Sequence, residues 1–277
     1  LIVKSFRKKT DEEIFVLPRF AIVGKPNVGK SSLLNVLLGE ERTIVTEIAG
    51  TTRDTIHTRY KKFNHDFLLI DTAGIRKKRK FEDNVEFYSV MRAIRAIENC
   101  DVCFMVLDAL HGMEAQDVNI FRLADRNKKG IVIVVNKWDL IEKETGSAEE
   151  FKKNIYKKIA PFTDVPIIFT SALNKQRIMK MVQEAEKVFL NKKKRIADEE
   201  LTEFLLQVVQ SNPPSSEKGK LVEIKSIVQI PASVPVFAVF CNLPKAIKES
   251  YKRFLGNKMR EKFDFSGVPI QIHFRKK

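Results

Sequence analysis

A glycine-rich loop at residues 24–31, Gly-Lys-Pro-Asn-Val-Gly-Lys-Ser, constrains the fold of this chain more than any other feature. It follows an apolar run at residues 20–23 and precedes a helical pattern at residues 32–38. A strand that turns directly into a helix gathers backbone N–H groups and the positive end of the helix dipole at one point, where a phosphate binds. The order predicts an α/β fold that binds a nucleoside triphosphate. The alternative is a glycine-rich turn with no ligand.

Two side chains of this phosphate loop have distinct expected roles. Lys30 is expected to reach the β- and γ-phosphate oxygens and to act in hydrolysis, and the Ser31 hydroxyl is expected to ligate Mg²⁺. The other residues expected around the phosphates are Gly24, Asn27, Val28, Gly29 and Ser32.

Residues 136–139, Asn-Lys-Trp-Asp, follow the apolar run 131–135 and so lie at the carboxyl end of a predicted buried strand. The Asp139 carboxylate can accept hydrogen bonds from the N1–H and the exocyclic amine of guanine, whereas adenine offers no such pair of donors. Guanine is therefore the predicted base, with the Ala172 N–H directed at its O6. The other residues expected at the base are Asn136, Lys137 (its stem along the ring), Ser171 and Leu173.

Residues 71–74, Asp-Thr-Ala-Gly, end another apolar run and place a carboxylate at a strand tip on the same edge. Asp71 is expected to hold Mg²⁺ through a water, and the Gly74 N–H is expected to bond the γ-phosphate only while that phosphate is present. Thr52, in the polar loop 41–55, is the expected second protein ligand of Mg²⁺. These motifs together predict a switch with two nucleotide-dependent states.

The ordered motifs resemble those of the TrmE–Era–EngA–septin group of GTPases, and the whole chain is similar to the EngA family of bacterial ribosome-biogenesis GTPases. The resemblance implies the second of that family's two tandem GTPase domains, followed by its C-terminal KH-like domain. Because one GTPase domain is present and the chain begins at Leu1, we expect a fragment whose missing first GTPase domain is a partner in cis. The segments that carry the likeness are residues 44–54, 74–76, 88–93, 170–177 and 197–277. The expected divisions are a linker remnant at 1–18, a GTPase domain at 19–195 and a KH-like domain at 196–277.

One departure from Ras-like enzymes bears on the mechanism. Ile75 stands where those enzymes carry a glutamine that orients the attacking water, so no side chain there can position water. The resemblance to TrmE implies a replacement, a potassium ion near the β- and γ-phosphates that stabilises developing charge. The residues at the matching positions are Asn27, Thr46, Ile48 and Thr51. The alternative is that Asn27 only hydrogen-bonds the loop backbone.

Composition is consistent with a two-domain protein that faces a polyanion. The chain has 277 residues, 44% of them hydrophobic, which is enough for two cores. Its net charge is +15, and the part from residue 192 onward is the more basic per residue. Such charge favours nucleic acid as a partner, although it also serves solubility. The sequence shows no apolar run long enough to span a membrane and no signal peptide, and we expect a cytoplasmic monomer.

Cys100 and Cys103 form a Cys-x-x-Cys pair, which raises a metal or redox interpretation. They lie in or beside a strand pattern at 101–107, where positions three apart are expected to point to opposite faces. No second Cys or His pair in the sequence completes a zinc site, so structural burial is expected.

The remaining periodicities predict strands and helices in alternation, which indicates a mostly parallel sheet covered on both faces, with the ligand at the carboxyl ends of the strands. Strands are predicted at 20–23, 56–63, 67–72, 101–107, 131–135 and 166–170. Helices are predicted at 31–38, 85–98, 115–128, 148–159 and 176–193. The C-terminal part is predicted as helix 201–210, strands 221–229 and 236–242, helix 246–263 and strand 269–274, an order that resembles a smaller α+β KH-like fold.

The C-terminal part lacks the Gly-x-x-Gly loop with which ordinary KH domains clamp RNA. A basic helix face remains, formed by Lys248, Lys252, Arg253, Lys258, Arg260 and Lys262. We expect this face to dock on RNA or protein of the large ribosomal subunit, and a solvated helix face is the alternative.

The expected function is a GTP-hydrolysing switch in assembly of the large ribosomal subunit, with GTP or GDP, Mg²⁺ and K⁺ as cofactors. Two alternatives stay open. One is a nucleotide-gated binding module that hydrolyses GTP negligibly without the missing domain. The other is a tRNA-modification GTPase like TrmE, against which the KH-like tail argues.

Overall fold

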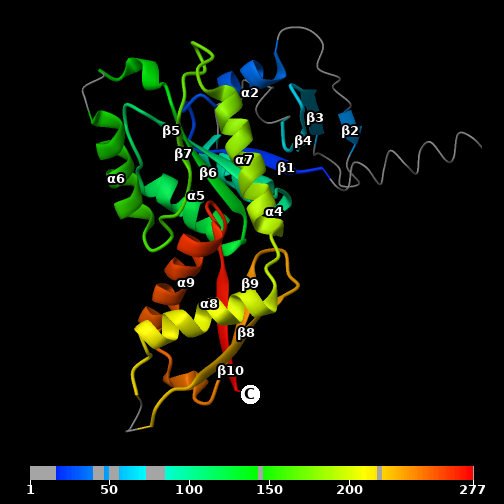
Figure 1. The fold of residues 1–277 in the computed structure, drawn as a ribbon. Coiled ribbons are helices and arrows are strands. Elements are labelled where there is room, and N and C mark those ends of the chain that lie inside the picture. The colour runs from blue at the N-terminus through cyan, green and yellow to red at the C-terminus, as the bar shows by residue number, and fades with distance from the viewer. Residues whose placement is uncertain are drawn as a thin grey trace, which may run out of the picture.

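The computed structural model describes residues 17–39, 47–49, 56–72, 85–142, 146–216 and 220–276. A 7-stranded sheet has the order β2-β3-β4-β1-β5-β6-β7, and a 3-stranded sheet has the order β10-β9-β8. Figure 1 shows the larger sheet with its helices as one unit and the smaller sheet as a second unit beneath it. We refer to them as the N-terminal unit, up to residue 193, and the C-terminal unit, from residue 198.

The strands of the N-terminal unit form a mostly parallel sheet. They are β1 (Arg19–Val23), β2 (Glu47–Ala49), β3 (Ile56–Lys62), β4 (His65–Leu69), β5 (Val102–Asp108), β6 (Gly130–Asn136) and β7 (Ile167–Phe169). In the described residues the strands β4, β1, β5, β6 and β7 run parallel to one another, and the pairings β2–β3 and β3–β4 are antiparallel. The predicted fold class is confirmed. The prediction of a continuous loop at 41–55 is wrong at β2, because a three-residue edge strand is too short to show a periodicity.

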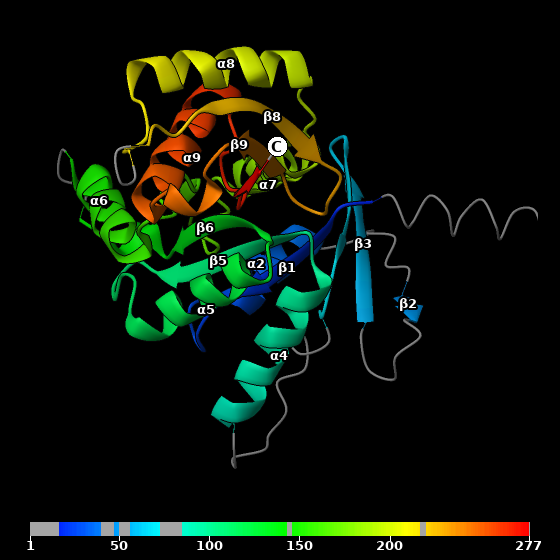
Figure 2. The same cartoon turned by 90° about the horizontal axis from the view of Figure 1, so that it is seen from below.

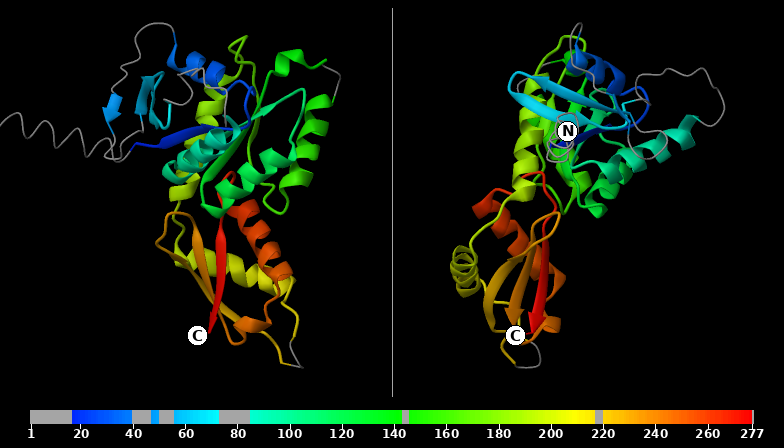
Figure 3. Two further views of the ribbon diagram at one scale, coloured as in Figure 1. Left: turned by 180° about the vertical axis from the view of Figure 1, so that it is seen from behind. Right: turned by 90° about the vertical axis from the view of Figure 1, so that its right-hand side faces the viewer.

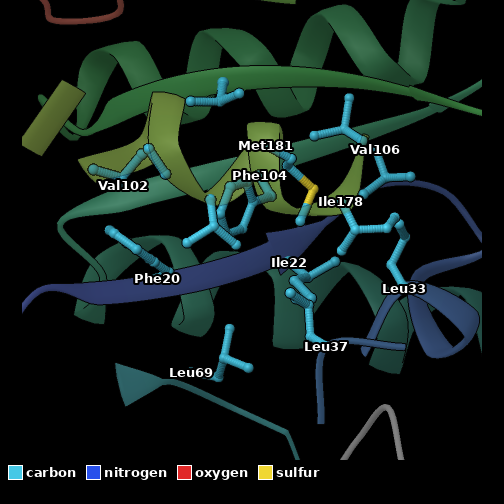
Figure 4. Close-up of a cluster of buried hydrophobic side chains, with 14 of the residues drawn as sticks. Phe20, Ile22, Leu33, Leu37, Leu69, Val102, Phe104, Val106, Ile178 and Met181 are labelled. Atoms are coloured by element: carbon cyan, nitrogen blue, oxygen red, sulfur yellow. The ribbon is translucent and has the colours of Figure 1, made fainter. Parts of the chain in front are cut away.

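Helices cover both faces of this sheet, as Figures 1 and 2 show. On one face lie α2 (Lys30–Leu38) and α7 (Ile178–Lys193), which share a core with alternate strand residues such as Phe20 and Phe104 (Figure 4). On the other lie α4 (Val85–Asn99), α5 (Ala115–Arg126) and α6 (Ser147–Ile159), packed against the intervening strand residues such as Ala21 and Met105. Because both faces are covered, β5 and β6 are buried at every position.

The C-terminal unit follows the predicted order of helix, strand, strand, helix and strand. Its elements are α8 (Asp198–Ser211), β8 (Ile224–Ile230), β9 (Val236–Cys241), α9 (Glu249–Phe263) and β10 (Gln271–Lys276). Strand β9 is central, antiparallel to β8 and parallel to β10. The C-terminal unit has a hydrophobic core of its own, which includes Leu201, Phe237 and Leu255. A short 3-10 helix, η2 (Pro244–Ala246), precedes α9, so the helix begins later than predicted (Figure 3).

The loop after α9 joins the two units through backbone hydrogen bonds. The Gly267 carbonyl accepts from the Ile131 N–H at 2.8 Å, and the Gly267 N–H donates to the Asp164 carbonyl at 2.8 Å. Gly267 has φ +76°, and a Cβ there would lie 2.4 Å from Val188 Cγ2 and 2.9 Å from the Ile131 oxygen. Glycine is therefore required at this contact.

Arg260 lies at the same junction. Its guanidinium donates to the Val268 carbonyl at 2.7 Å and lies 3.3 Å from the Asp164 carboxylate and 4.7 Å from the centre of the Phe162 ring. Burial lowers the pKa of Arg260, and the neighbouring Asp164 opposes the shift. The prediction that Arg260 belongs to an exposed docking face is wrong, because its side chain is only 13% exposed and stabilises the contact between the units.

Cys100 and Cys103 are buried, as predicted. The prediction that they point to opposite faces is wrong, since their sulfur atoms lie 3.2 Å apart. Cys100 follows the last residue of α4 and precedes β5, so the alternation of a strand does not apply to it. None of the described helices combines the length and apolar character that crossing a membrane requires.

Candidate nucleotide-binding site

The phosphate loop connects β1 to α2 and approaches two neighbouring strands closely. Gly24 has φ +145°, and a Cβ on it would lie 2.4 Å from the Val106 carbonyl oxygen. Gly29 has φ +96° and precedes α2, and a Cβ on it would lie 2.1 Å from the Asn136 side-chain nitrogen. Both glycines are needed because the chain passes where a side chain would collide with its neighbours.

Lys30 begins α2, and its side chain turns back into the loop. The ammonium donates to the Gly24 carbonyl at 2.8 Å and also to the Lys25 carbonyl. Burial lowers the pKa of Lys30 to about 8, against the opposing effect of Asp117. A buried ammonium surrounded by loop backbone is suited to an anionic ligand, which would compensate its desolvation.

Lys25 ties the phosphate loop to α5. Its ammonium pairs with Glu114 and lies 3.2 Å from the carboxylate of Asp117, whose side chain is fully buried. Asp117 also accepts from the Glu114 N–H at 2.9 Å, and the two acids form a capping box at the start of α5. The sequence analysis missed this pair, although two acids three residues apart before a helix are a signal for such a box.

Asp139 follows β6 within a 3-10 helix, η1 (Trp138–Leu140). Among the described residues, nothing hydrogen-bonds its buried Oδ1 atom. Leaving a buried carboxylate oxygen unpaired costs free energy, so the position fits a ligand that supplies the donor. The ring of Trp138 packs 4.1 Å from the ring of Phe169, centre to centre, which fixes η1 against β7. The donors of a guanine are of the kind that this oxygen lacks.

Asn136, the last residue of β6, joins three loops. Its side-chain nitrogen donates to the Val28 carbonyl at 2.9 Å, and its side-chain oxygen accepts from the Ala172 N–H at 3.0 Å. The Ala172 N–H is expected to donate to guanine O6, but in the structure it donates to the Asn136 side chain. It could make both hydrogen bonds only as a bifurcated donor. Ser171 is buried in the same loop, whereas Leu173 is 82% exposed.

Asp108 holds Lys137 in place. The Lys137 ammonium donates to Asp108 Oδ2 at 2.6 Å, and Asp108 Oδ1 accepts from the Leu110 N–H at 2.9 Å. Burial alone would raise the pKa of Asp108, but these two hydrogen bonds hold it below its ordinary value. Sequence analysis missed Asp108, although it ends an apolar run as Asp71 and Asn136 do.

The expected magnesium ligands are described in part. Asp71 follows β4 with φ +55°, and burial raises its pKa against the opposing charges of Arg92 and Arg95. Within the described part of the chain, its carboxylate takes part in no hydrogen bond or ion pair, so its oxygen atoms fit the role of ligands to a divalent cation, directly or through water. Ser31 lies in the first turn of α2, exposed beside Ser32. Thr52 and Gly74 lie outside the described residues.

The expected potassium ligands are described only at two positions. Asn27 is exposed on the phosphate loop with φ +63°, and Ile48 lies in β2, where it pairs with His57. Thr46 and Thr51 lie outside the described residues, as does Ile75.

The carboxyl ends of the parallel strands bring these residues to one edge of the sheet. The phosphate loop follows β1, Asp71 follows β4, Asp139 follows β6, and Ala172 follows β7. The C-terminal unit contacts the opposite edge, at the first residues of β6 and before β7 (Figure 1). The arrangement can hold a purine base and a polyphosphate side by side, at the place where α/β sheets bind ligands.

Comparison with known proteins places both units in families. The family described as "50S ribosome-binding GTPase" matches residues 19–137, and the family described as "KH-domain-like of EngA bacterial GTPase enzymes, C-terminal" matches residues 195–275. Among solved structures, Era of Aquifex aeolicus bound to GDP and AlF4⁻ is similar with a TM-score of 0.48 and 26% identity, covering 94% of this chain and 92% of that chain.

Relatives of the whole chain are also found. It is 55% identical over 276 residues to the GTPase Der of Christiangramia forsetii and 54% identical over 280 residues to that of Bacteroides fragilis. Each alignment covers 100% of this chain and 64% of the relative, so the chain spans just under two thirds of the length of these proteins. From the glycine-rich loop to the smaller sheet, the chain belongs to the EngA family of GTPases, also called Der.

Proposed function

We propose that this chain binds guanine nucleotide with Mg²⁺, hydrolyses GTP to GDP and phosphate, and acts as a cytoplasmic switch in assembly of the large ribosomal subunit. The observation that carries the nucleotide assignment is the buried Oδ1 of Asp139, which has no hydrogen-bond partner among the described residues and lies three residues after Asn136, which bonds the phosphate loop. The Asp139 oxygen and the phosphate loop lie at the same edge of the sheet. The guanine base would supply hydrogen-bond donors to Asp139, and the phosphates would supply negative charge to the loop.

Each residue has one role in this proposal. Asp139 accepts from the guanine ring, and the Lys30 ammonium leaves its backbone carbonyls for the β- and γ-phosphate oxygens. Ser31 and Asp71, with Thr52, hold Mg²⁺, which when bound neutralises the charge of those phosphates. The Gly74 N–H bonds the γ-phosphate and so distinguishes GTP from GDP.

For hydrolysis, we propose that Asn27 and the backbone carbonyls of Thr46, Ile48 and Thr51 hold a potassium ion. Such an ion would supply positive charge beside the β–γ bridge. Ile75 has no polar group with which to assist hydrolysis. Two observations support this role for Asn27: its side chain is exposed on the phosphate loop, and its φ of +63° belongs to a conformation that asparagine tolerates better than most residues.

Hydrolysis is tested by single-turnover GTPase assays on the whole chain and on two variants, Lys30→Ala and Ser31→Ala. Both should lose Mg²⁺–GTP binding or turnover while remaining folded, because neither side chain belongs to a hydrophobic core of the described residues. Normal turnover in both variants would remove the phosphate loop from the site.

The ribosomal role is tested by sedimentation of the chain with purified large ribosomal subunits, in a GTP analogue and in GDP. A switch predicts a larger pelleted fraction in one nucleotide than in the other. Equal pelleting in both states would contradict the switch. Pelleting in neither state would contradict the ribosomal partner.

A further inference from the structure

The C-terminal unit has a pocket of about 430 Å³ between the loop that follows α8 and the first turns of α9. The lining residues that matter here are Asn212, Pro213, Pro214, Lys248, Tyr251 and Phe254. The other end of α9 carries Arg260 and contacts the N-terminal unit. Eleven residues of helix, about 16 Å, separate Glu249 at the start of α9 from Arg260, and Figures 1 and 3 show the two ends of α9 far apart.

Two aromatic rings form one wall of the pocket. The centres of the Tyr251 and Phe254 rings lie 5.6 Å apart with an interplanar angle of 43°, and both side chains are half-buried. The Tyr251 hydroxyl donates to the Asn212 carbonyl at 2.9 Å, which ties its ring to the opposite loop. Buried Pro214 adds a rigid apolar surface. The wall is preformed and partly open to solvent, as a surface that stacks a flat ring must be.

Positive charge lies in and next to the segments that line this pocket. Lys248 lines the pocket, Lys245 lies on η2 just before it, and Arg253 lies one turn further along α9. All three side chains are exposed, and no ion pair within the described part of the chain involves any of them. The nearby acid Glu249 is already engaged by Lys252 at 2.5 Å. Lys248 therefore offers the pocket a cation, and Lys245 and Arg253 add charge close by in the chain, which favours a phosphate over a neutral chain.

We infer that this pocket binds one nucleotide of single-stranded RNA, with the base against Tyr251 and Phe254 and its phosphate at Lys248. The inference rests on the proposed function, in which the C-terminal unit meets ribosomal RNA, and it names the structure that makes the contact. A proline-rich peptide could also pack against the aromatic rings, but its neutral backbone gains nothing from the exposed cations Lys245, Lys248 and Arg253. RNA uses both features of the pocket.

The test measures binding of a fluorescein-labelled pentauridylate to the whole chain by fluorescence anisotropy at several salt concentrations. Phe254→Leu should weaken binding about tenfold with little change in salt dependence, because it removes a stacking surface. Lys248→Gln should reduce the slope of log affinity against log salt by about 0.7, the value for one phosphate contact on a single strand.

Matched controls exist in the N-terminal unit. Phe63→Leu removes a ring that is 75% exposed, and Lys153→Gln removes an exposed charge from α6. Neither should change pentauridylate binding. Lys248 is exposed, so its replacement leaves the fold intact, and the unfolding temperature of Phe254→Leu separates lost stacking from lost structure.

Unchanged affinity in both Phe254→Leu and Lys248→Gln would overturn the pocket assignment. So would binding of a proline-rich decapeptide, in place of the RNA, that depends on Phe254. Sedimentation with large subunits separates this result from the proposed function. If the chain still pellets with the subunits but Phe254→Leu does not change pentauridylate binding, the pocket assignment is rejected and the ribosomal role stands. If pentauridylate binding depends on Phe254 but the chain does not pellet, the ribosomal role is rejected and the pocket assignment stands.

Discussion

The Asn136 side chain donates to the Val28 carbonyl at 2.9 Å, so one hydrogen bond joins the segment proposed to bind the base to the loop proposed to bind the phosphates. The same amide accepts from the Ala172 N–H, and all three groups are buried. The protein itself thereby fixes the separation of the two proposed sites.

Asn136→Ala should weaken GDP binding at least tenfold while leaving the preference for GDP over ADP intact. The change leaves buried polar groups of Val28 and Ala172 without a partner, at a cost of about 1–3 kcal/mol each, but it spares the Asp139 carboxylate. Isothermal titration calorimetry measures both affinities. Asn127→Ala, which removes a side-chain bond to Leu123 at the end of α5, is the control. Wild-type GDP affinity in Asn136→Ala would show that the bridge does not position the loops.

Asp139→Asn should exchange guanine for xanthine. The amide loses the charge-assisted bonds to guanine, worth about 1.5–3 kcal/mol, and gains a donor that suits the carbonyl at position 2 of xanthine. We expect GDP affinity to fall at least tenfold and affinity for xanthosine diphosphate to rise. Competition binding with both nucleotides measures the exchange. Retained preference for GDP would remove Asp139 from the base site.

Asn27→Ala should abolish potassium stimulation of GTP hydrolysis. In the wild type we expect turnover at least tenfold faster in K⁺ than in Na⁺ at equal ionic strength, about 1.4 kcal/mol of barrier, because Na⁺ is too small for the same oxygen ligands. Single-turnover rates in the two salts give the ratio, and GDP affinity should change little.

The matched control for this variant is Asn64→Ala. Asn64 has φ +62° in the turn between β3 and β4, so its replacement carries the same backbone cost as that of Asn27, at φ +63°, away from the phosphates. Equal wild-type rates in K⁺ and Na⁺, or a loss of stimulation in both variants, would reject the potassium role.

Asp101→Asn should lower the free energy of unfolding by about 1 kcal/mol near neutral pH. Burial alone would raise the pKa of Asp101, but the Arg19 side chain, the Arg19 N–H at 3.0 Å and Lys192 hold it below its ordinary value of 3.8. A carboxyl with a lowered pKa stabilises the folded state above its unfolded pKa and loses that effect as pH falls through the folded one. Urea unfolding should show the difference between variant and wild type at pH 7 and a smaller one below pH 3.8. A difference independent of pH would mean that charge is not its cause.

The parts of the fold that depend on local pattern were predictable from sequence. An apolar run that ends in a polar residue predicts strand β6 and its last residue Asn136. The spacing of the glycines predicts the phosphate loop. Asp108 carried the same signal and was predictable by the rule that identified Asp71. The hydrogen bond between Ala172 and Asn136 was not predictable, because it depends on how two loops approach each other.

Contacts between distant segments left no local signal at all. Arg260 reads as one more charge on a basic helix face, yet the approach of Asp164 and Phe162 buries it. Lys25 reads as a loop residue, yet Asp117 on α5 anchors it. In both cases the tertiary arrangement decides the environment, and a periodicity along the chain cannot contain that information.

The backbone bonds of Gly267 couple the stability of the N-terminal unit to the presence of the C-terminal unit. Ile131, at the start of β6, has its N–H satisfied by a residue of the C-terminal unit, and Val268 completes the core of the N-terminal unit. Cutting the chain after α7 would leave that N–H without its acceptor and would expose the apolar side chains that pack against Val268. The shortened protein would therefore melt at a lower temperature than the whole chain.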